Sequence, residues 1–355
     1  MSNASAHLAK LAVQPRPAGS EAASGARAYC ADVLHAAGFQ TAEQAFEYSA
    51  FSGAWAMPIA GVAASFSGIL LYLGRQMPWL IPVAVTTLAL TIGALVWLGA
   101  DGVLAFPLMR RRGVNLQAVR GAAEPTVWLV AHIDSKWQPV SMIARVAGVV
   151  GTTLGVIALF ALSLAPARAD AAAAAALLLT WLFSTPLILS IVDARNTGAL
   201  DNASGVSAVL AAAELLPPAA RAGVLISDAE ELALAGARAW ARSRTAGVAL
   251  NCDSIDDHGQ LTVMYSRHRP ESLVSRLTRA ASDHGETVRV MRLIPGVLTD
   301  SVALADAGWE TLTLSRGDLR TLQRIHTSRD TLETLRGAGL DVAARVLADT
   351  ATELG

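Results

Sequence analysis

Five short segments of the chain carry histidine or carboxylate side chains that could bind metal ions. They are His132-Ile133-Asp134, Asp201-Asn202, Glu230-Glu231, Asp253 and His326. Imidazole nitrogens and carboxylate oxygens without a thiolate suit zinc, manganese or cobalt, and they do not make a structural zinc finger. If one carboxylate bridges, the set is large enough for two ions, and two ions about 3.5 to 4 Å apart are a known arrangement for hydrolysis.

The adjacent acids Glu230 and Glu231 could divide the work of hydrolysis. One would bind a metal ion, while its neighbour takes a proton from the bound water. Each residue also has an ordinary explanation, because a lone Asp is a favoured helix cap and glutamates suit the first turn of a helix. The order of these residues along the chain, and their placement after predicted strands, favour the catalytic interpretation.

Short apolar runs and helical patterns alternate around these residues. Strands are predicted at residues 126–131, 222–226, 248–251 and 311–314, and helices at 205–216, 232–243, 271–284 and 301–307. This alternation predicts an α/β fold with a mostly parallel, helix-flanked sheet. His132, Glu230 and Asp253 each follow one of these strands closely, and open α/β sheets bind ligands at the carboxyl ends of their strands. The candidate ligands are therefore expected to converge.

Four long uncharged stretches account for an unusually apolar composition. Of the 355 residues, 53% are hydrophobic and 16% are charged, and the apolar excess lies at residues 54–73, 77–100, 146–165 and 171–192. A helix needs about 20 apolar residues to cross a bilayer, so each stretch is predicted to be a membrane helix. The stretches form two hairpins, with turns at 74–76 and 167–170. We therefore expect a multi-pass integral membrane protein in contact with the lipid bilayer.

The two hairpins interrupt a polar remainder that is long enough for one compact domain. The hairpins occupy residues 51–100 and 141–192, and the domain is assembled from residues 1–50, 101–140 and 193–355. Because His132 and Asp201 flank the second hairpin at short distances along the chain, the site is expected to adjoin the membrane surface. The N-terminal segment has no apolar core of a signal peptide, so the first hairpin is expected to direct insertion.

The distribution of basic residues predicts the orientation in a bacterial-type cell membrane. The domain side of the predicted helices carries Arg110, Arg111, Arg112, Lys136, Arg145 and Arg195, whereas the turns carry only Arg75 and Arg168. Basic residues gather on the cytoplasmic side, so the termini and the domain are expected there. The cluster at 110–112 is interpreted as a topogenic or lipid-headgroup cluster.

Charge and cysteine content exclude several functions. A net charge of −1 gives no positive surface for polyanions, so nucleic acid is not an expected partner. Cys30 and Cys252 exclude a disulfide framework, although one bridge between them stays open. The predicted membrane helices have no ionisable residue near their centres, which argues against a transporter.

In their order along the chain, the motifs resemble a known family. The string His132-x-Asp134, Asp201-Asn202-x-x-Gly205, Glu230-Glu231, Asp253, His326 is similar to that of the co-catalytic zinc exopeptidases, which include aminopeptidase Y and the bacterial zinc aminopeptidases. Residues 15–20 and 37–39 are similar to the N-terminal segment of that family. The resemblance covers nearly all of the chain outside the hairpins.

This resemblance implies a zinc-exopeptidase fold, a peptide substrate and two divalent metal ions, namely zinc. Asp201 would bridge the ions, with His132 and Asp253 on one ion and Glu231 and His326 on the other. The resemblance thereby implies an aminopeptidase that hydrolyses the N-terminal residues of peptides with a metal-activated water.

The resemblance also implies roles for two residues outside the ligand set. Glu230 would be the general base, and Asp134 would hold the His132 ring through its second nitrogen. Two positions depart from the family, because Ile325 stands where a tyrosine is common and Ser301 where a histidine is common. Neither is a ligand, so the departures concern substrate preference and rate.

Two alternatives share this fold. Glutaminyl cyclases are aminoacyltransferases that keep a single zinc, and transferrin-receptor-like proteins are non-catalytic receptors or scaffolds that usually lack ligands. The full ligand set with Glu230 favours the peptidase over the scaffold. Asp330 matches a family position as well, and a structural role is expected for it. The oligomeric state, the native metal and the preferred N-terminal residue stay open.

Overall fold

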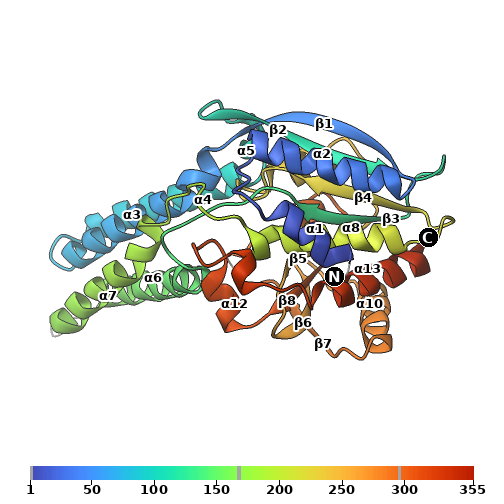
Figure 1. Ribbon diagram of the computed structural model, residues 1–355. Coiled ribbons are helices and arrows are strands. Elements are labelled where there is room, and N and C mark those ends of the chain that lie inside the picture. Colours follow the sequence, from blue (N-terminus) through green and yellow to red (C-terminus); the bar gives the residue numbers. More distant parts are fainter. Residues whose placement is uncertain (1–2, 166–168, 295–296) are drawn as a thin grey trace.

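The computed structural model describes residues 3–165, 169–294 and 297–355. Figure 1 shows an α/β domain that holds both termini, and two helical hairpins that project side by side from one end of it. The second hairpin turn, expected at residues 167–170, falls partly outside the described residues.

The described residues form one sheet of eight strands in the order β1-β2-β4-β3-β5-β8-β6-β7. The strands are β1 (Gln40–Ser49), β2 (Arg110–Val119), β3 (Val127–His132), β4 (Ala222–Ser227), β5 (Val248–Ile255), β6 (Gln260–Tyr265), β7 (Val288–Arg292) and β8 (Glu310–Gly317). The central strands β4, β3, β5 and β8 run parallel, whereas β1 with β2, β2 with β4, and β6 with β8 are antiparallel. The predicted parallel arrangement is therefore correct for the centre, and the sheet as a whole is mixed.

Burial explains which strands were predictable. Every residue of β3 is buried, and so is every residue of β4, which is why both have continuous apolar sequences. In contrast, β1 is mostly exposed or half-buried along its length and has a polar sequence. The apolar patterns accordingly predict the central strands and do not predict β1, β2, β6 or β7. Arg110–Arg112 are the first residues of β2, and Arg110 forms an ion pair with Glu47 of β1.

Helices cover both faces of the sheet. The helices of the domain are α1 (Asn3–Leu11), α2 (Glu21–Ala36), α5 (Gly102–Ala105), α8 (Gly205–Leu215), α9 (Ala235–Ala241), α10 (Glu271–Asp283), α11 (Asp300–Asp306), α12 (Leu319–Arg324) and α13 (Leu340–Leu354). Alternate side chains of a strand point to opposite faces, so Leu129 of β3 faces a core shared with α1, α2, α8, α10 and α13, whereas Trp128 faces a second core with Trp240 of α9. Trp128 is thus a core residue, in contact with the Trp240 ring at 4.8 Å between centroids.

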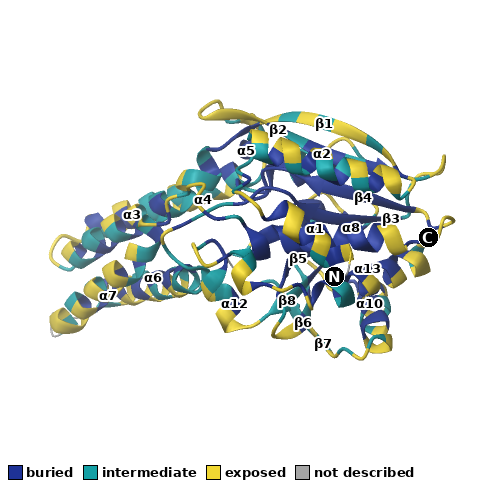
Figure 2. Ribbon diagram, in the orientation of Figure 1, coloured by how far each residue is buried: buried dark blue, intermediate teal, exposed yellow. Residues whose placement is uncertain are grey.

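Four of the described helices are long and apolar enough to cross a membrane. They are α3 (Phe51–Gly74), α4 (Leu80–Gly99), α6 (Met142–Ser163) and α7 (Asp170–Ile188), and they coincide with the four predicted stretches. Leu90, Ile92 and Val96 of α4 are each at least 60% exposed. Figure 2 shows exposed and half-buried residues along both hairpins, while the central strands are buried. An apolar surface of this extent normally lies against a membrane or another protein.

Small residues allow these helices to pack closely against one another. A β-carbon added at Gly155 of α6 would lie 2.4 Å from Oγ1 of Thr180 on α7. The hydroxyl groups of Ser65 on α3 and Ser184 on α7 lie 2.7 Å apart. Close approach at glycine and hydrogen bonds between hydroxyls are typical of membrane helices, where apolar burial does not drive association.

Both hairpins are inserted between points of the domain that are neighbours in space. Ser49 at the end of β1 pairs with Arg110 at the start of β2, so the first hairpin occupies the turn between two antiparallel strands. The backbones of Trp137 and Asp193 donate to each other at 2.8 and 2.9 Å and close the base of the second hairpin. Insertions at such points leave the pairing of the domain intact. Cys30 and Cys252 are both buried free thiols, so the bridge left open by the sequence is absent.

Candidate metal centre

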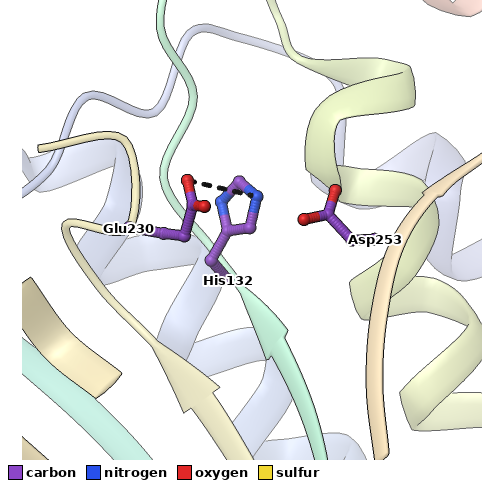
Figure 3. A group of neighbouring side chains, drawn as sticks. All are labelled: His132, Glu230 and Asp253. Atoms are coloured by element: carbon purple, nitrogen blue, oxygen red, sulfur yellow. Dashed lines mark ion pairs between the residues drawn. The ribbon is translucent and has the colours of Figure 1, made fainter. Parts of the chain in front are cut away.

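The structure brings all of the predicted ligands together at the carboxyl ends of the central strands. Their positions are the end of β3 for His132, the loop after β4 for Glu230 and Glu231, the last part of β5 for Asp253, the turn before α8 for Asp201 and the loop after α12 for His326. Figure 3 shows the side chains of His132, Glu230 and Asp253 pointing toward one another. The prediction of convergence from the strand ends is therefore confirmed for these residues.

Asp201 lies between the two histidines, and each of its carboxylate oxygens faces one ring. Its Oδ1 is 3.2 Å from Nε2 of His132, and its Oδ2 is 2.9 Å from Nε2 of His326. On the far side, Oε1 of Glu231 lies 3.0 Å from the same His326 nitrogen. An aspartate between two imidazoles has the position that a bridging ligand requires.

The side chains fall into two groups with metal-ligand spacing. His132, Glu230 and Asp253 form one group, and Asp201, Glu231 and His326 form the other; within each group, one ligand atom per residue lies within 4.8 Å of the others. All six side chains are buried. Buried carboxylates this close repel one another unless cations lie between them.

Unsatisfied polar atoms show that the donors fit metal ions. Nε2 of His132, Nε2 of His326 and Oε1 of Glu231 are buried. They lie within ion-pair distance of one another or of Asp201, but among the described residues none of them makes a hydrogen bond of normal geometry. Nearly all buried polar atoms in proteins have such a partner. These atoms face each other across the cluster, so a divalent cation ligated by nitrogen and oxygen would satisfy them together.

Burial and neighbouring charges separate the two adjacent glutamates. Burial raises the pKa of Glu230 well above its ordinary value, and the nearby carboxylates of Glu231 and Asp253 add to the rise. Burial acts in the same direction on Glu231, but His326 and Lys136 outweigh it and lower the pKa of Glu231 to about 2. Glu230 is therefore the more basic of the pair, as a proton acceptor should be.

Asp134 ties the end of β3 to the loop that carries the glutamates. Its two carboxylate oxygens accept the backbone N–H groups of Glu230 at 3.1 Å and Glu231 at 3.2 Å. Its backbone carbonyl oxygen lies 3.1 Å from Nδ1 of His132, nearer than its carboxylate at 3.5 Å. Asp134 thus lies beside the second ring nitrogen, as the resemblance implies, and the carbonyl makes the shorter contact.

Asp330 and Arg16 hold the segment that carries Asp201. The carboxylate of Asp330 accepts the backbone N–H groups of Leu200 at 2.6 Å and Asp201 at 3.2 Å. Arg16 is 1% exposed, and its guanidinium donates to the backbone carbonyls of Leu11, Ile133, Thr197 and Gly198. The structural role predicted for Asp330 fits these contacts. The resemblance at residues 15–20 includes Arg16 but does not predict this role, because its partners lie up to 182 positions away.

Two cations that the sequence patterns do not assign to the site touch its ligands. Nζ of Lys136 lies 2.6 Å from Oε2 of Glu231. Nη2 of Arg145, in the first turn of α6, lies 2.5 Å from Nδ1 of His326. An imidazole that binds a metal through Nε2 keeps its hydrogen on Nδ1, and that nitrogen cannot then accept from a guanidinium. Arg145 and a metal ion therefore favour different tautomers of the neutral His326 ring.

The mixed α/β sheet with flanking helices is like the fold of solved zinc aminopeptidases. The structure is similar to a leucine aminopeptidase precursor from Bacteroides thetaiotaomicron, with 15% identity, a TM-score of 0.60 and coverage of 99% of this chain and 96% of the other. It is similar to the zinc aminopeptidase BSAP from Bacillus subtilis, with 14% identity, a TM-score of 0.58 and coverage of 99% and 94%. A glutaminyl cyclase from Bacteroides thetaiotaomicron matches with 15% identity, a TM-score of 0.60 and coverage of 99% and 96%.

The sequence profile of Peptidase family M28 matches residues 115–351, and the chain belongs to this family. The resemblance to co-catalytic zinc exopeptidases is thereby confirmed. A search among curated proteins found no match. At these identities the structural likeness establishes the fold, which aminopeptidases and glutaminyl cyclases share.

Proposed function

We propose that this protein is a membrane-anchored zinc aminopeptidase that removes N-terminal residues from peptides. The observation that carries the proposal is the position of Asp201 between two histidines, with a further carboxylate on each side and Glu230 beside the cluster. One zinc ion would be held by His132 and Asp253, another by Glu231 and His326, and both by Asp201.

The residues around the ligands support a hydrolytic role. When bound, the zinc ions would polarise the scissile carbonyl and increase the acidity of a water molecule. Glu230 would take the proton of that water and deliver it to the leaving amine, and its raised pKa suits both transfers. Asp134 would hold the His132 ring and the Glu230 backbone in fixed positions relative to each other, because it contacts both.

Anchoring in a membrane is the second part of the proposal. Its support is the set of four long apolar helices with exposed side chains, which project together from the domain (Figure 1). The ends of these helices that join the domain are the ends near most of the basic residues, so the domain and termini would face the cytoplasm. The lipid bilayer would then lie beside the candidate metal centre.

A glutaminyl cyclase is the second candidate, because the structural similarity to a cyclase equals that to an aminopeptidase. Cyclisation of an N-terminal glutamine with a single zinc would use one of the two ligand groups, whereas the chain retains both. The full ligand set also supports an enzyme rather than a receptor or scaffold on the same fold.

Metal analysis combined with a peptide assay tests the proposal. The purified protein in detergent is expected to hold two zinc ions per chain and to release amino acids from free peptides but not from N-acetylated ones. Asp201→Asn should lose both ions and the activity, because it removes the shared negative ligand. One ion per chain, with ammonia released from peptides that begin with glutamine, would instead identify a cyclase. If the zinc-loaded protein catalyses neither reaction, the result would support a non-catalytic receptor or scaffold.

A further inference from the structure

A cavity of about 320 Å³ lies between the metal-ligand cluster and the bases of the two hairpins. Its inner wall includes Asp134, Lys136 and Glu231, and its outer wall includes Trp55, Met109 and Ile191. One end is therefore polar and reaches a predicted zinc ligand, while the other end holds large apolar side chains together with the exposed charged residues Arg111 and Asp193. A ligand pocket in proteins commonly combines a mainly apolar lining with a few convergent polar groups.

The outer wall is built from the segments that connect the domain to the apolar helices. Trp55 is in the first turns of α3, Met109 immediately precedes β2, and Ile191 follows α7. These three side chains are between 40% and 54% exposed, although all are large and apolar. Tryptophan with an apolar body and a polar N–H is typical of the interface between lipid and water. The outer end of the cavity is thus continuous with the surface that would meet the bilayer.

We propose that this cavity binds the apolar tail of an amphiphilic peptide substrate that reaches the metal centre from the bilayer. The proposal rests on the proposed function and adds the substrate class to it. The polar end of such a substrate, with its amide, would lie at Glu231 and Lys136, where Nζ of Lys136 is 2.6 Å from the glutamate. The tail would contact Ala54 and Trp55 of α3 and continue toward the lipid.

The size of the cavity limits how much of the tail it holds. A volume of about 320 Å³ is at the lower end of the range for ligand pockets, so it accommodates a short alkyl segment and not a whole lipid chain. Each methylene buried there should improve kcat/KM on the order of fourfold. The improvement should stop once the cavity is filled, because any further methylene extends beyond the cavity and has the same surroundings in the bound and the free substrate.

A series of leucine alkylamides with tails from methyl to decyl provides the test in the zinc-loaded protein. The ratio of kcat/KM for the decyl and methyl amides is expected to be large in the wild type and to fall at least tenfold in Ala54→Phe, which fills the cavity. Val62→Phe is the matched control, because Val62 lies on the same helix with 54% exposure and does not line the cavity. The ratio in this control should equal that of the wild type.

A binding measurement keeps the test independent of turnover and of the stability of one variant. In the Glu230→Gln background, a leucine alkylamide with a brominated tail should quench the fluorescence of Trp55, measured as the difference from Trp55→Phe. Quenching in this background, together with no hydrolysis of any alkylamide by the zinc-loaded wild type, would refute the aminopeptidase function and support the cavity. If the methyl amide is hydrolysed, kcat/KM does not change with tail length and Trp55 is not quenched, tail binding in the cavity is refuted while the aminopeptidase function is supported. An equal loss in Val62→Phe would also overturn it, because the tail effect would then reflect partitioning into lipid.

Discussion

Glu230→Gln is the substitution that separates catalysis from metal binding in this site. The change keeps the size of the side chain, and the backbone N–H of residue 230 would still donate to Asp134. It removes the ability to take a proton at a point 3.8 Å from Nε2 of His132. We expect the variant to retain two zinc ions per chain and to lose turnover.

The size of the loss follows from the role assigned to the side chain. A general base typically contributes about 10²- to 10⁴-fold to the rate, which corresponds to roughly 3 to 5 kcal/mol in the activation free energy. Glu230 is buried and burial raises its pKa, so this carboxylate is a stronger base than an exposed one would be. We therefore expect kcat to fall by at least about 10²-fold with little change in KM.

Glu231→Gln is the matched control, since it makes the same change at the adjacent position. Glu231 faces His326 at 3.0 Å, so the control should lose a zinc ion as well as activity. Zinc content by elemental analysis and steady-state hydrolysis of leucine amide would be measured on both variants. Loss of an ion from Glu230→Gln would refute the reasoning, because Glu230 also lies in a group with His132 and Asp253 and would then be a ligand itself.

Three further outcomes follow from the contacts of the site. Burial lowers the pKa of His132, but the charges of Glu230 and its other acidic neighbours outweigh burial and raise this pKa well above its ordinary value. Protons therefore compete with zinc for the ring at low pH, and the zinc affinity measured by chelator competition should rise by about tenfold per pH unit until the ring is neutral. A zinc affinity that does not change with pH would contradict this. Arg145→Gln, whose amide oxygen can accept from Nδ1–H of His326, should tighten zinc binding by roughly tenfold, and weaker binding would show that Arg145 supports the loaded site. Asp330→Asn leaves one of the two backbone N–H groups, of Leu200 or Asp201, without an acceptor. The free energy of unfolding measured by urea titration should fall by about 1 to 3 kcal/mol. An unchanged midpoint of urea unfolding would contradict the structural role of Asp330.

The apolar helices could be predicted from the sequence, whereas strand β1 could not. Each apolar helix is a continuous stretch whose length alone predicts it, and α3, α4, α6 and α7 coincide with the predictions within a few residues. By contrast, β1 is a strand because it pairs with β2 across the whole first hairpin, from Gln40 opposite Val119 to Ser49 opposite Arg110. Its polar sequence has no apolar run, so only the pairing partner defines it.

Some residues of the site could likewise be predicted from the sequence, and others could not. Residue types and their order predicted the ligands and the general base, because a metal centre needs particular donor atoms wherever they come from. The contacts of Lys136 and Arg145 could not be predicted, since both residues had an equally good explanation as basic residues beside membrane helices. Arg16 is a further case, because a buried guanidinium with carbonyl partners from three segments has no local pattern.

By itself, the sequence determined the family, the candidate ligands and the four apolar helices, since each depends on residue identity or on a continuous stretch of chain. Only the tertiary structure decided that the sheet is mixed, that Arg145 of an apolar helix contacts the ligand His326, and that a cavity joins the cluster to the hairpin bases. These features arise where segments far apart in the sequence pack together, and the side-chain geometry of such contacts is set by the whole fold rather than by neighbours in sequence.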